Sequence, residues 1–308
     1  MNYYSNGKLL LTGEYLVLDG AKSLALPTKF GQDLVVQKMK EQQLIWGSFT
    51  HTGECWFEAV FDLQKLRLVS CTFNSKKEGN GEIIAETLLD ILKEAKKINP
   101  SFLASENGFV VKTALTFPRD WGLGSSSTLI NSIASWAKVD AFQLLWNSFK
   151  GSGYDIACAQ NERAIFYQLE NDRPIVEPVN FNPNFKENLF FVHLNQKQDS
   201  KEGILKFRQR EQSFQKEIEQ ISTISDEFLK ATSLIDFNKL IVEHEQIISS
   251  IIKLKPVKEN LFLDYFGEIK SLGAWGGDFV LVTGNDETSR YFKKKGFDTV
   301  LSYSEMIL

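Results

Sequence analysis

A segment rich in proline, glycine and serine at residues 118–128, "PRDWGLGSSST", separates two regularly patterned segments. Upstream, "GFVVKTALTF" (108–117) is rich in β-branched and aromatic residues and predicts a strand. Downstream, apolar residues recur at helical spacing behind serines that could cap a helix. A helix N-terminus has unpaired N–H groups and a partial positive charge, and glycines let the backbone approach an anion closely. The segment therefore predicts a strand–loop–helix junction that could bind a phosphate.

Two familiar nucleotide-binding patterns do not describe this segment. A Walker A loop requires Lys followed by Ser or Thr after its glycines, and no such pair follows here. In a dinucleotide-binding fingerprint, Gly122 and Gly124 would be followed by a third glycine, but Ser127 occupies that position. Dinucleotide binding stays open as an alternative, and it predicts that the chain binds NAD(P).

Three other glycine-bearing stretches contain groups that could act on a phosphate. They are "NGKLLLTGEYLVLDG" (6–20), "GSGYDIA" (151–157) and "SLGAWGGDF" (271–279). In the second stretch, Asp155 could take a proton as a general base, or it could simply cap the helix that follows. In the first, Lys8 could offset phosphate charge, or it could be a solvated strand residue. Taken singly, each stretch could be an ordinary turn.

The rest of the chain supplies the elements that would position these residues. Up to about residue 75 it predicts strands and turns, and the predicted strands are 8–18, 23–28, 33–39, 43–49 and 54–63. An apolar stripe predicts a helix at 81–98. Further strands are expected at 164–171 and 188–195, and helices from about 201 to 253. Strands and helices are mixed without steady βαβ alternation, which favours an α+β fold.

Composition limits the function classes. The chain has 308 residues, of which 43% are hydrophobic and 24% charged, as in soluble globular proteins. Its net charge of −4 makes nucleic acid an unfavourable partner. No apolar run is long enough to span a bilayer, and the N-terminus lacks the apolar core of a signal peptide. The three cysteines form no CxxC pair, so neither a disulfide framework nor a zinc site is indicated. We therefore expect a cytoplasmic protein with no membrane partner.

Taken together and in this order, the four stretches resemble the motifs of the GHMP kinases. "GKLLLTGEYLVLDG" is similar to the first motif, "PRDWGLGSSS" to the ATP loop, and "GAWGGD" to the C-terminal glycine motif. The resemblance implies a two-domain α+β fold. Residues 1–165 would form the N-terminal mixed α/β nucleotide-binding domain, and residues 166–308 a C-terminal ferredoxin-like α/β domain. It also implies ATP and Mg²⁺ as cofactors, and we expect a small-molecule substrate and a homodimer.

The resemblance assigns roles to individual residues. Asp155 matches the catalytic aspartate, and Lys8 matches the lysine that pairs with it. The residues matched to ATP binding are Pro118, Gly122, Leu123, Gly124, Ser125, Ser126 and Ser127, and Ser126 also matches the serine that reaches the metal. The residues matched to the acceptor site are Glu14, Ser200, Gly273, Gly276, Gly277 and Asp278, although Glu14 could be purely structural.

One departure concerns the metal. Several GHMP kinases supply a glutamate to Mg²⁺ from the helix before the aspartate motif. Residues 129–154 contain no glutamate, and Asp140 is their only acid. Either Ser126, Asp155 and the phosphates hold the ion, or an acid from another segment does. The carboxylate ligand of Mg²⁺ is therefore left open.

The acceptor is indicated by small differences within the motifs. "GEY" at 13–15 and Asp278 after the paired glycines are more similar to phosphomevalonate kinases than to mevalonate kinases. A phosphorylated acceptor would need cations, and Arg119, Lys197 and Lys201 are candidates. We therefore expect a phosphomevalonate kinase of isoprenoid precursor synthesis. The alternatives are a mevalonate kinase, a diphosphomevalonate decarboxylase, or a sensor that binds nucleotide without turnover.

Overall fold

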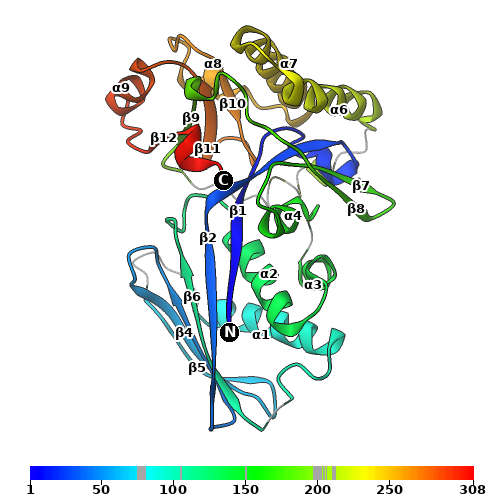
Figure 1. Cartoon of the computed structure of the whole chain (residues 1–308), viewed down its shortest axis with the longest axis vertical. Helices are drawn as coiled ribbons and strands as arrows, with labels where there is room; N and C mark the ends of the chain where they lie inside the picture. The colour runs from blue at the N-terminus through cyan, green and yellow to red at the C-terminus, as the bar shows by residue number, and fades with distance from the viewer. Residues whose placement is uncertain are drawn as a thin grey trace. The chain divides into compact units, whose positions relative to one another are not determined.

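The computed structural model describes residues 1–74, 81–104, 106–149, 151–196, 203, 205, 207–209 and 213–308 (Figure 1). The chain forms two compact units. Unit 1 comprises Met1–Gly7, Phe30–Arg119 and Gly124–Gln160, and unit 2 comprises Lys8–Lys29, Asp120–Leu123 and Asn161–Leu308. The sequence prediction divides the chain once, at residue 165. In the structure, the last segment of unit 1 ends at Gln160, and unit 2 also includes two segments from the N-terminal half of the chain.

Unit 1 is built on a sheet with the strand order β5-β4-β3-β6-β2. β3 and β6 pair in parallel, and the other neighbours in this series are antiparallel. The strands are β1 (Asn2–Leu10), β2 (Ser23–Met39), β3 (Gln43–Phe49), β4 (Cys55–Asp62), β5 (Arg67–Phe73) and β6 (Gly108–Leu115). The two strands predicted at 23–28 and 33–39 are therefore one long strand, β2, which begins in unit 2 and continues into unit 1.

Helices cover one face of this sheet, and the core of unit 1 lies between the two layers. The helices are α1 (Gly81–Ile98), α2 (Ser125–Ala137), α3 (Ala141–Ser148) and α4 (Tyr154–Gln160). Figure 1 shows α1, α2 and α3 on the same side of the strands. Apolar residues from both layers form one buried cluster that includes Trp46, Phe61, Leu92 and Ile133. The helix predicted at 81–98 is confirmed, because its apolar stripe faces this core.

The strand predicted at 8–18 is wrong beyond Leu10. After β1 the chain turns, and Leu16–Asp19 form a short 3-10 helix, η1. Gly13 has φ +90°, and a Cβ at this position would lie 2.0 Å from the Ser23 Oγ. This close approach bends the chain away from the extended path, although the apolar residues on both sides fit a strand pattern.

Unit 2 contains a four-stranded antiparallel sheet in the order β10-β11-β9-β12. Its strands are β9 (Leu189–His193), β10 (Ile269–Ser271), β11 (Phe279–Thr283) and β12 (Val300–Ser302). Helices α6 (Gln215–Lys230) and α7 (Leu234–Ile252) follow β9, and α9 (Glu287–Lys294) lies between β11 and β12 in sequence. This β-α-β-β-α-β series is the ferredoxin-like arrangement that the motif resemblance implies.

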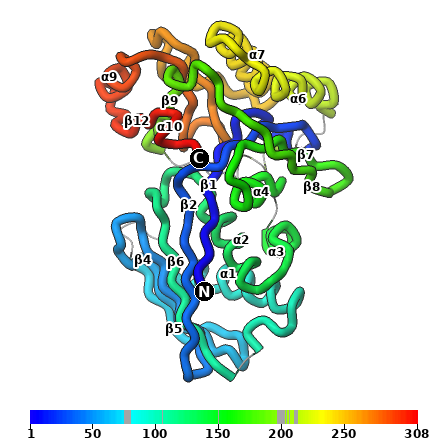
Figure 2. The backbone as a smooth tube through the Cα atoms, in the orientation of Figure 1, coloured from blue at the N-terminus to red at the C-terminus, as the bar shows by residue number. Residues whose placement is uncertain are grey.

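The remaining elements of unit 2 are short. They are β7 (Ile165–Glu170), β8 (Arg173–Pro178), η2 (Lys186–Asn188), α8 (Val257–Leu261) and α10 (Tyr303–Met306). Helices α6 and α7 lie side by side, as the backbone tube in Figure 2 shows. Ser233 begins α7 by accepting the Asp236 N–H, so the predicted helical region is divided at 231–233. No helix in the described part of the chain is both long and apolar enough to cross a membrane.

Candidate functional site

The predicted phosphate loop has the backbone form that its glycines suggest. Gly122 has φ +66° and Gly124 has φ +90°, both in the left-handed region that favours glycine. Gly124 is the N-cap of α2, and among the described residues no side chain caps it. The first N–H groups of this thirteen-residue helix therefore keep the capacity to bind an anion. This arrangement fits the polyphosphate of a nucleotide.

The three serines at the start of α2 have different surroundings. Ser126 is exposed, which fits the role of metal ligand that the motif resemblance gives it. Ser127 is buried and donates its hydroxyl hydrogen to the Gly124 carbonyl at 2.9 Å. Thr128 donates to the Gln32 side chain at 2.7 Å, which ties the helix start to β2 within unit 1. Ser125 and Ser126 are thus better placed than Ser127 to offer hydroxyl groups to a ligand.

Lys8 forms two hydrogen bonds with the middle of the loop, within unit 2. Its ammonium donates to the Gly122 carbonyl at 2.9 Å, and its backbone N–H donates to the Leu123 carbonyl at 3.1 Å. Trp121 packs edge-on against Phe279 with ring centroids 5.3 Å apart. The positive charge of Lys8 is therefore held beside Gly122, one of the glycines that are predicted to receive phosphate.

Asp278 lies against the same glycine. A Cβ built on Gly122 would meet the Asp278 carboxyl group, with the Asp278 Cγ at 2.2 Å. The Asp278 backbone is fixed by two hydrogen bonds, because its N–H donates to Gln196 O and its carbonyl accepts from Leu194 N–H. Within unit 2, the last glycine motif and the phosphate loop are therefore in direct contact, and they leave no room for a side chain at residue 122.

This contact predicts the effect of Gly122→Ala. The new Cβ would displace the Asp278 carboxyl group, and alanine is strained at φ +66°, so we expect a loss of about 1–3 kcal/mol in stability. We also expect a rise of about tenfold in the KM for ATP, because the loop would be distorted. Urea unfolding and ATP titration measure both quantities. Gly53→Ala is the matched control, since it has φ +82° with no atom within 4 Å of its Cβ. Equal effects of the two variants would show that the contact with Asp278 has no importance.

Asp155 lies in the first turn of α4, in unit 1. Gly153 precedes it with φ +92° and accepts the Ala157 N–H, so the glycine turn leads directly into the helix. The Asp155 Oδ1 accepts the N–H of Ile156 at 3.1 Å. α4 packs on α2, and Gln160 donates to Asn131 at 3.0 Å. Within unit 1, the acid and the serine-rich helix are thus held by packed neighbouring elements.

The other predicted acceptor residues fall into three groups. Gly273 and Gly276 have φ values of +63° and +93° in the turn between β10 and β11, with open space where a Cβ would be. Gly277 is buried in the same turn. Ser200, together with Lys197 and Lys201, lies outside the described residues. Arg119 belongs to unit 1, where its guanidinium stacks on Trp56 at 3.6 Å from the ring centroid. Burial there lowers the pKa of Arg119.

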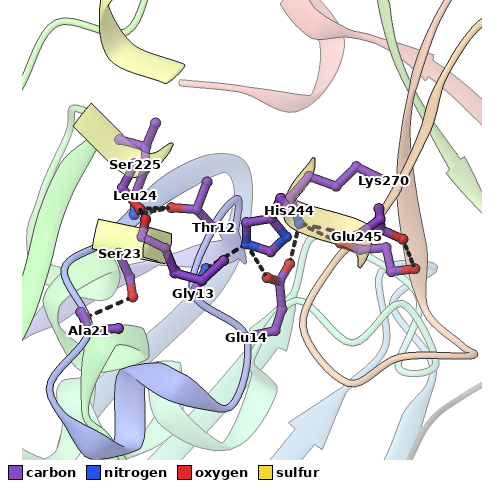
Figure 3. A network of polar contacts seen from close by, with 12 residues as sticks. Thr12, Gly13, Glu14, Ala21, Ser23, Leu24, Ser225, His244, Glu245 and Lys270 are labelled. Carbon is purple, nitrogen blue, oxygen red and sulfur yellow. Dashed lines mark hydrogen bonds and ion pairs between the residues drawn. The ribbon is translucent and has the colours of Figure 1, made fainter. Parts of the chain in front are cut away.

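Glu14 lies in the protein interior, with 0% of its surface exposed. Figure 3 shows its carboxyl group between His244 and Lys270. Its Oε1 accepts a hydrogen bond from Lys270 Nζ at 2.6 Å, and Lys270 is also 0% exposed. Lys270 Nζ lies 3.8 Å from Glu245 Oε1, and it donates to the Ser271 carbonyl at 2.9 Å. The Ser271 hydroxyl donates to Glu245 Oε2 at 2.9 Å. The first motif, α7 and β10 thus share a buried cluster of charged side chains.

Burial dominates the electrostatics of this cluster. It raises the pKa of Glu14 to about 7 and that of Glu245 to about 8, against the opposing effect of Lys270. Burial and the charge of Lys270 hold the pKa of His244 well below its usual range. His244 is therefore neutral, and its Nε2 accepts the Gly13 N–H at 3.0 Å. The 3.1 Å contact between His244 Nε2 and Glu14 Oε2 is not an ion pair.

The sequence analysis assigns no role to His244, Glu245 or Lys270. A signal was available for two of them, because His244 and Glu245 continue the apolar stripe of Phe237, Ile241 and Ile248 on α7. Polar residues on a buried stripe indicate partners elsewhere in the core. Lys270 carried no comparable signal, since a lysine in a short strand is usually solvated.

The described residues contain no group of three or more His, Cys, Asp and Glu side chains that could hold a metal ion. This is consistent with the missing glutamate in residues 129–154. A Mg²⁺ ion that arrives with nucleotide phosphates needs fewer protein ligands, and the exposed hydroxyl of Ser126 is suited to that role.

Comparisons with known proteins bear on the fold. Neither protein-family models nor curated proteins gave a match to the sequence. Solved structures do match. Methanococcus jannaschii mevalonate kinase has a TM-score of 0.69 and 16% identity, covering 98% of this chain and 96% of that one.

Two further structures match over a similar length. Streptococcus pneumoniae phosphomevalonate kinase, solved with phosphomevalonate and AMPPNP, has a TM-score of 0.66 and 15% identity, covering 96% of this chain and 95% of that one. Lactococcus lactis galactokinase, solved with galactose, has a TM-score of 0.62 and 12% identity, covering 98% and 92%. Nearly the whole chain therefore has the fold of the GHMP kinases.

Proposed function

We propose that the chain is an ATP-dependent small-molecule kinase whose acceptor is phosphomevalonate. The observation that carries the proposal is the start of α2 in unit 1, where uncapped helix N–H groups follow Gly124. Within unit 2, Lys8 is hydrogen-bonded to Gly122, the other glycine of the predicted loop. Such a loop recognises the polyphosphate of a nucleotide through backbone hydrogens and fixed positive charge. The GHMP kinase fold supports the same function, because the matching structures include kinases of small molecules.

In the proposed reaction, an oxygen of the acceptor attacks the γ-phosphorus of ATP. A new P–O bond forms to the acceptor, the bond to the β-phosphate oxygen breaks, and ADP leaves with the electron pair. Asp155 orients the acceptor and takes its proton where that oxygen carries one. Lys8 offsets the negative charge on the transferring group, and the N–H groups at the start of α2 bind the phosphate oxygens. Mg²⁺, when bound with ATP through Ser126, neutralises phosphate charge.

The choice of phosphomevalonate rests on the first and last glycine motifs. Tyr15 follows Glu14, and Asp278 follows the paired glycines. The phosphomevalonate kinase that matches this fold was solved with phosphomevalonate itself. Mevalonate is the second candidate acceptor, because a mevalonate kinase matches the fold over a similar share of the chain.

An assay of ADP release tests both parts of the proposal. Purified protein with Mg²⁺ and ATP is offered mevalonate, phosphomevalonate, homoserine, galactose or diphosphomevalonate. We expect release that depends on phosphomevalonate, with no CO₂ formed. Release with diphosphomevalonate and with CO₂ would identify a decarboxylase instead. If no acceptor raises ADP release above that of ATP alone while nucleotide still binds, the protein is a sensor that binds nucleotide without turnover.

A further inference from the structure

We propose that Glu14, Glu245 and Lys270 share one proton at neutral pH, and that this protonated cluster holds the first glycine motif against the strand that leads into the last one. The proposal concerns residues of unit 2 alone and does not depend on the kinase reaction. It rests on the number of charges, on one close contact between acceptor atoms, and on the elements that the cluster joins.

The charges do not balance without an added proton. Two carboxyl groups face one ammonium group, and all three side chains are almost completely buried. Among the described residues, the charge of Lys270 acts on both carboxyls, and the charge of Glu14 acts on Glu245. His244 is neutral, and the nearby Thr12–Ser225 pair is uncharged (Figure 3). Two ionised carboxylates would therefore leave a net charge of −1 in the interior, which is costly.

The geometry at Glu14 also favours a proton. Its Oε2 lies 3.1 Å from His244 Nε2, which already accepts the Gly13 N–H. Two acceptor atoms at this distance repel each other unless a hydrogen lies between them. A proton on the Glu14 carboxyl removes its negative charge and so weakens this repulsion, while His244 Nε2 continues to accept the Gly13 N–H. The charge can then lie on Glu245, which accepts from the Ser271 hydroxyl. In the reverse arrangement, Glu245 carries the proton and the negative charge lies on Glu14, beside Lys270. Because the proton can lie on either carboxyl, the two carboxyls titrate as one unit.

The cluster joins two of the predicted acceptor segments. Glu14 lies in the first motif, while Lys270 and Ser271 end β10, immediately before the turn that contains Gly273, Gly276 and Asp278. Lys270 is hydrogen-bonded to both segments, because its ammonium group donates to Glu14 in the first motif and to the Ser271 carbonyl at the end of β10. A change in the charge of the cluster therefore acts on the start of the glycine turn. Trp275, buried in that turn with 2% exposure, can report such a change.

The direction of the pH effect follows from the raised pKa values. Both carboxyls have an ordinary value of 4.5 in the unfolded chain and values of about 7 and about 8 in the folded chain. The folded state therefore binds protons more tightly than the unfolded state. This contribution to stability is complete below pH 4.5, decreases as pH rises from 4.5 towards the folded-state values, and is absent above about 8.

The test compares thermal unfolding of the wild type and Glu245→Gln from pH 5.5 to 9. Glutamine removes the second carboxyl, so the variant needs no shared proton. Its Tm relative to the wild type should therefore increase by several degrees between pH 5.5 and about 8, and then stay constant. Glu243→Gln is the matched control, because Glu243 lies two residues away on the same helix but is exposed. It should follow the wild type at every pH. A difference between Glu245→Gln and the wild type that does not change with pH would overturn the shared proton.

Two measurements do not require a stable Glu245→Gln variant. The infrared spectrum of the wild type at about pH 7.5 should contain the C=O band of a protonated carboxyl, and the band should disappear on unfolding; its absence would overturn the proposal. The fluorescence of Trp275, taken as the difference between the wild type and Trp275→Phe, should shift to longer wavelength as pH rises through 7 to 8. A constant Trp275 signal would overturn the link to the glycine turn. Neither measurement uses ATP turnover, so a failed kinase assay leaves both results intact.

Discussion

Replacement of Asp155 by asparagine is expected to lower kcat by ~10²–10⁴ while the affinity for ATP changes little. Asparagine keeps the oxygen that accepts the Ile156 N–H, so the start of α4 should be preserved. It lacks the negative charge and the basicity that would orient and deprotonate an acceptor. Steady-state kinetics together with equilibrium binding of a non-hydrolysable ATP analogue separates the two effects.

The size of the loss should depend on the acceptor. A hydroxyl group keeps its proton at pH 7, so a kinase acting on mevalonate needs a base and should lose activity near the upper end of that range. A phosphate monoester has a second pKa of about 6 and is mostly ionised, so phosphomevalonate should give a loss near the lower end. Asp90→Asn, an exposed change on α1, is the control. Turnover of Asp155→Asn close to that of the control would remove this acid from the mechanism and leave it as a helix-start residue.

Replacement of Lys8 by methionine is expected to cost on the order of 3 kcal/mol of transition-state stabilisation, or about 10²-fold in kcat/KM. The ammonium group is hydrogen-bonded to Gly122 O in the loop that is predicted to bind phosphate. Methionine has a similar length, so the loss would reflect charge and hydrogen bonding rather than volume. The backbone bond from Lys8 N–H to Leu123 O does not involve the side chain and should remain.

The control for Lys8→Met is Lys38→Met, because Lys38 is an exposed lysine on β2. Single-turnover and steady-state rates are measured for both variants. If Lys8→Met raised only the KM for ATP and left kcat unchanged, the lysine would contribute equally to the ground state and the transition state. Its assignment as a catalytic residue would then be wrong.

Local signals predict much of the fold. The period of the apolar residues indicated α1 and the strands β3, β4, β6, β7 and β9 close to their observed bounds. The mixture of strands and helices indicated α+β, and the order of the motifs pointed to the GHMP kinase fold. These predictions depend on patterns within about twenty residues, which a single sequence displays directly.

Features that depend on distant residues were not predicted. Nothing local shows that β3 and β6 pair in parallel, or that the chain turns after Leu10. The burial of Lys270 is the clearest case, because Glu14 lies 256 residues earlier in the sequence. A charged side chain becomes stable in the interior only through such a partner, so its position cannot be read from its neighbours in sequence. The roles assigned to Asp155, Lys8 and the serines remain predictions.

The inclusion of Lys8–Lys29 in unit 2 has a consequence for biosynthesis and for dissection of the chain. Thr28 pairs with Ile307, and the Leu308 N–H donates to Pro27 O, so the N-terminal segment of this unit is completed by residues that come much later in the sequence. Unit 2 therefore cannot finish folding until residues 307 and 308 have been synthesised. A fragment that begins at residue 166 would also lack Glu14 and leave Lys270 without its nearest counter-charge. Expression of the two halves as separate proteins should yield an aggregation-prone C-terminal piece, which added peptide 1–29 would rescue.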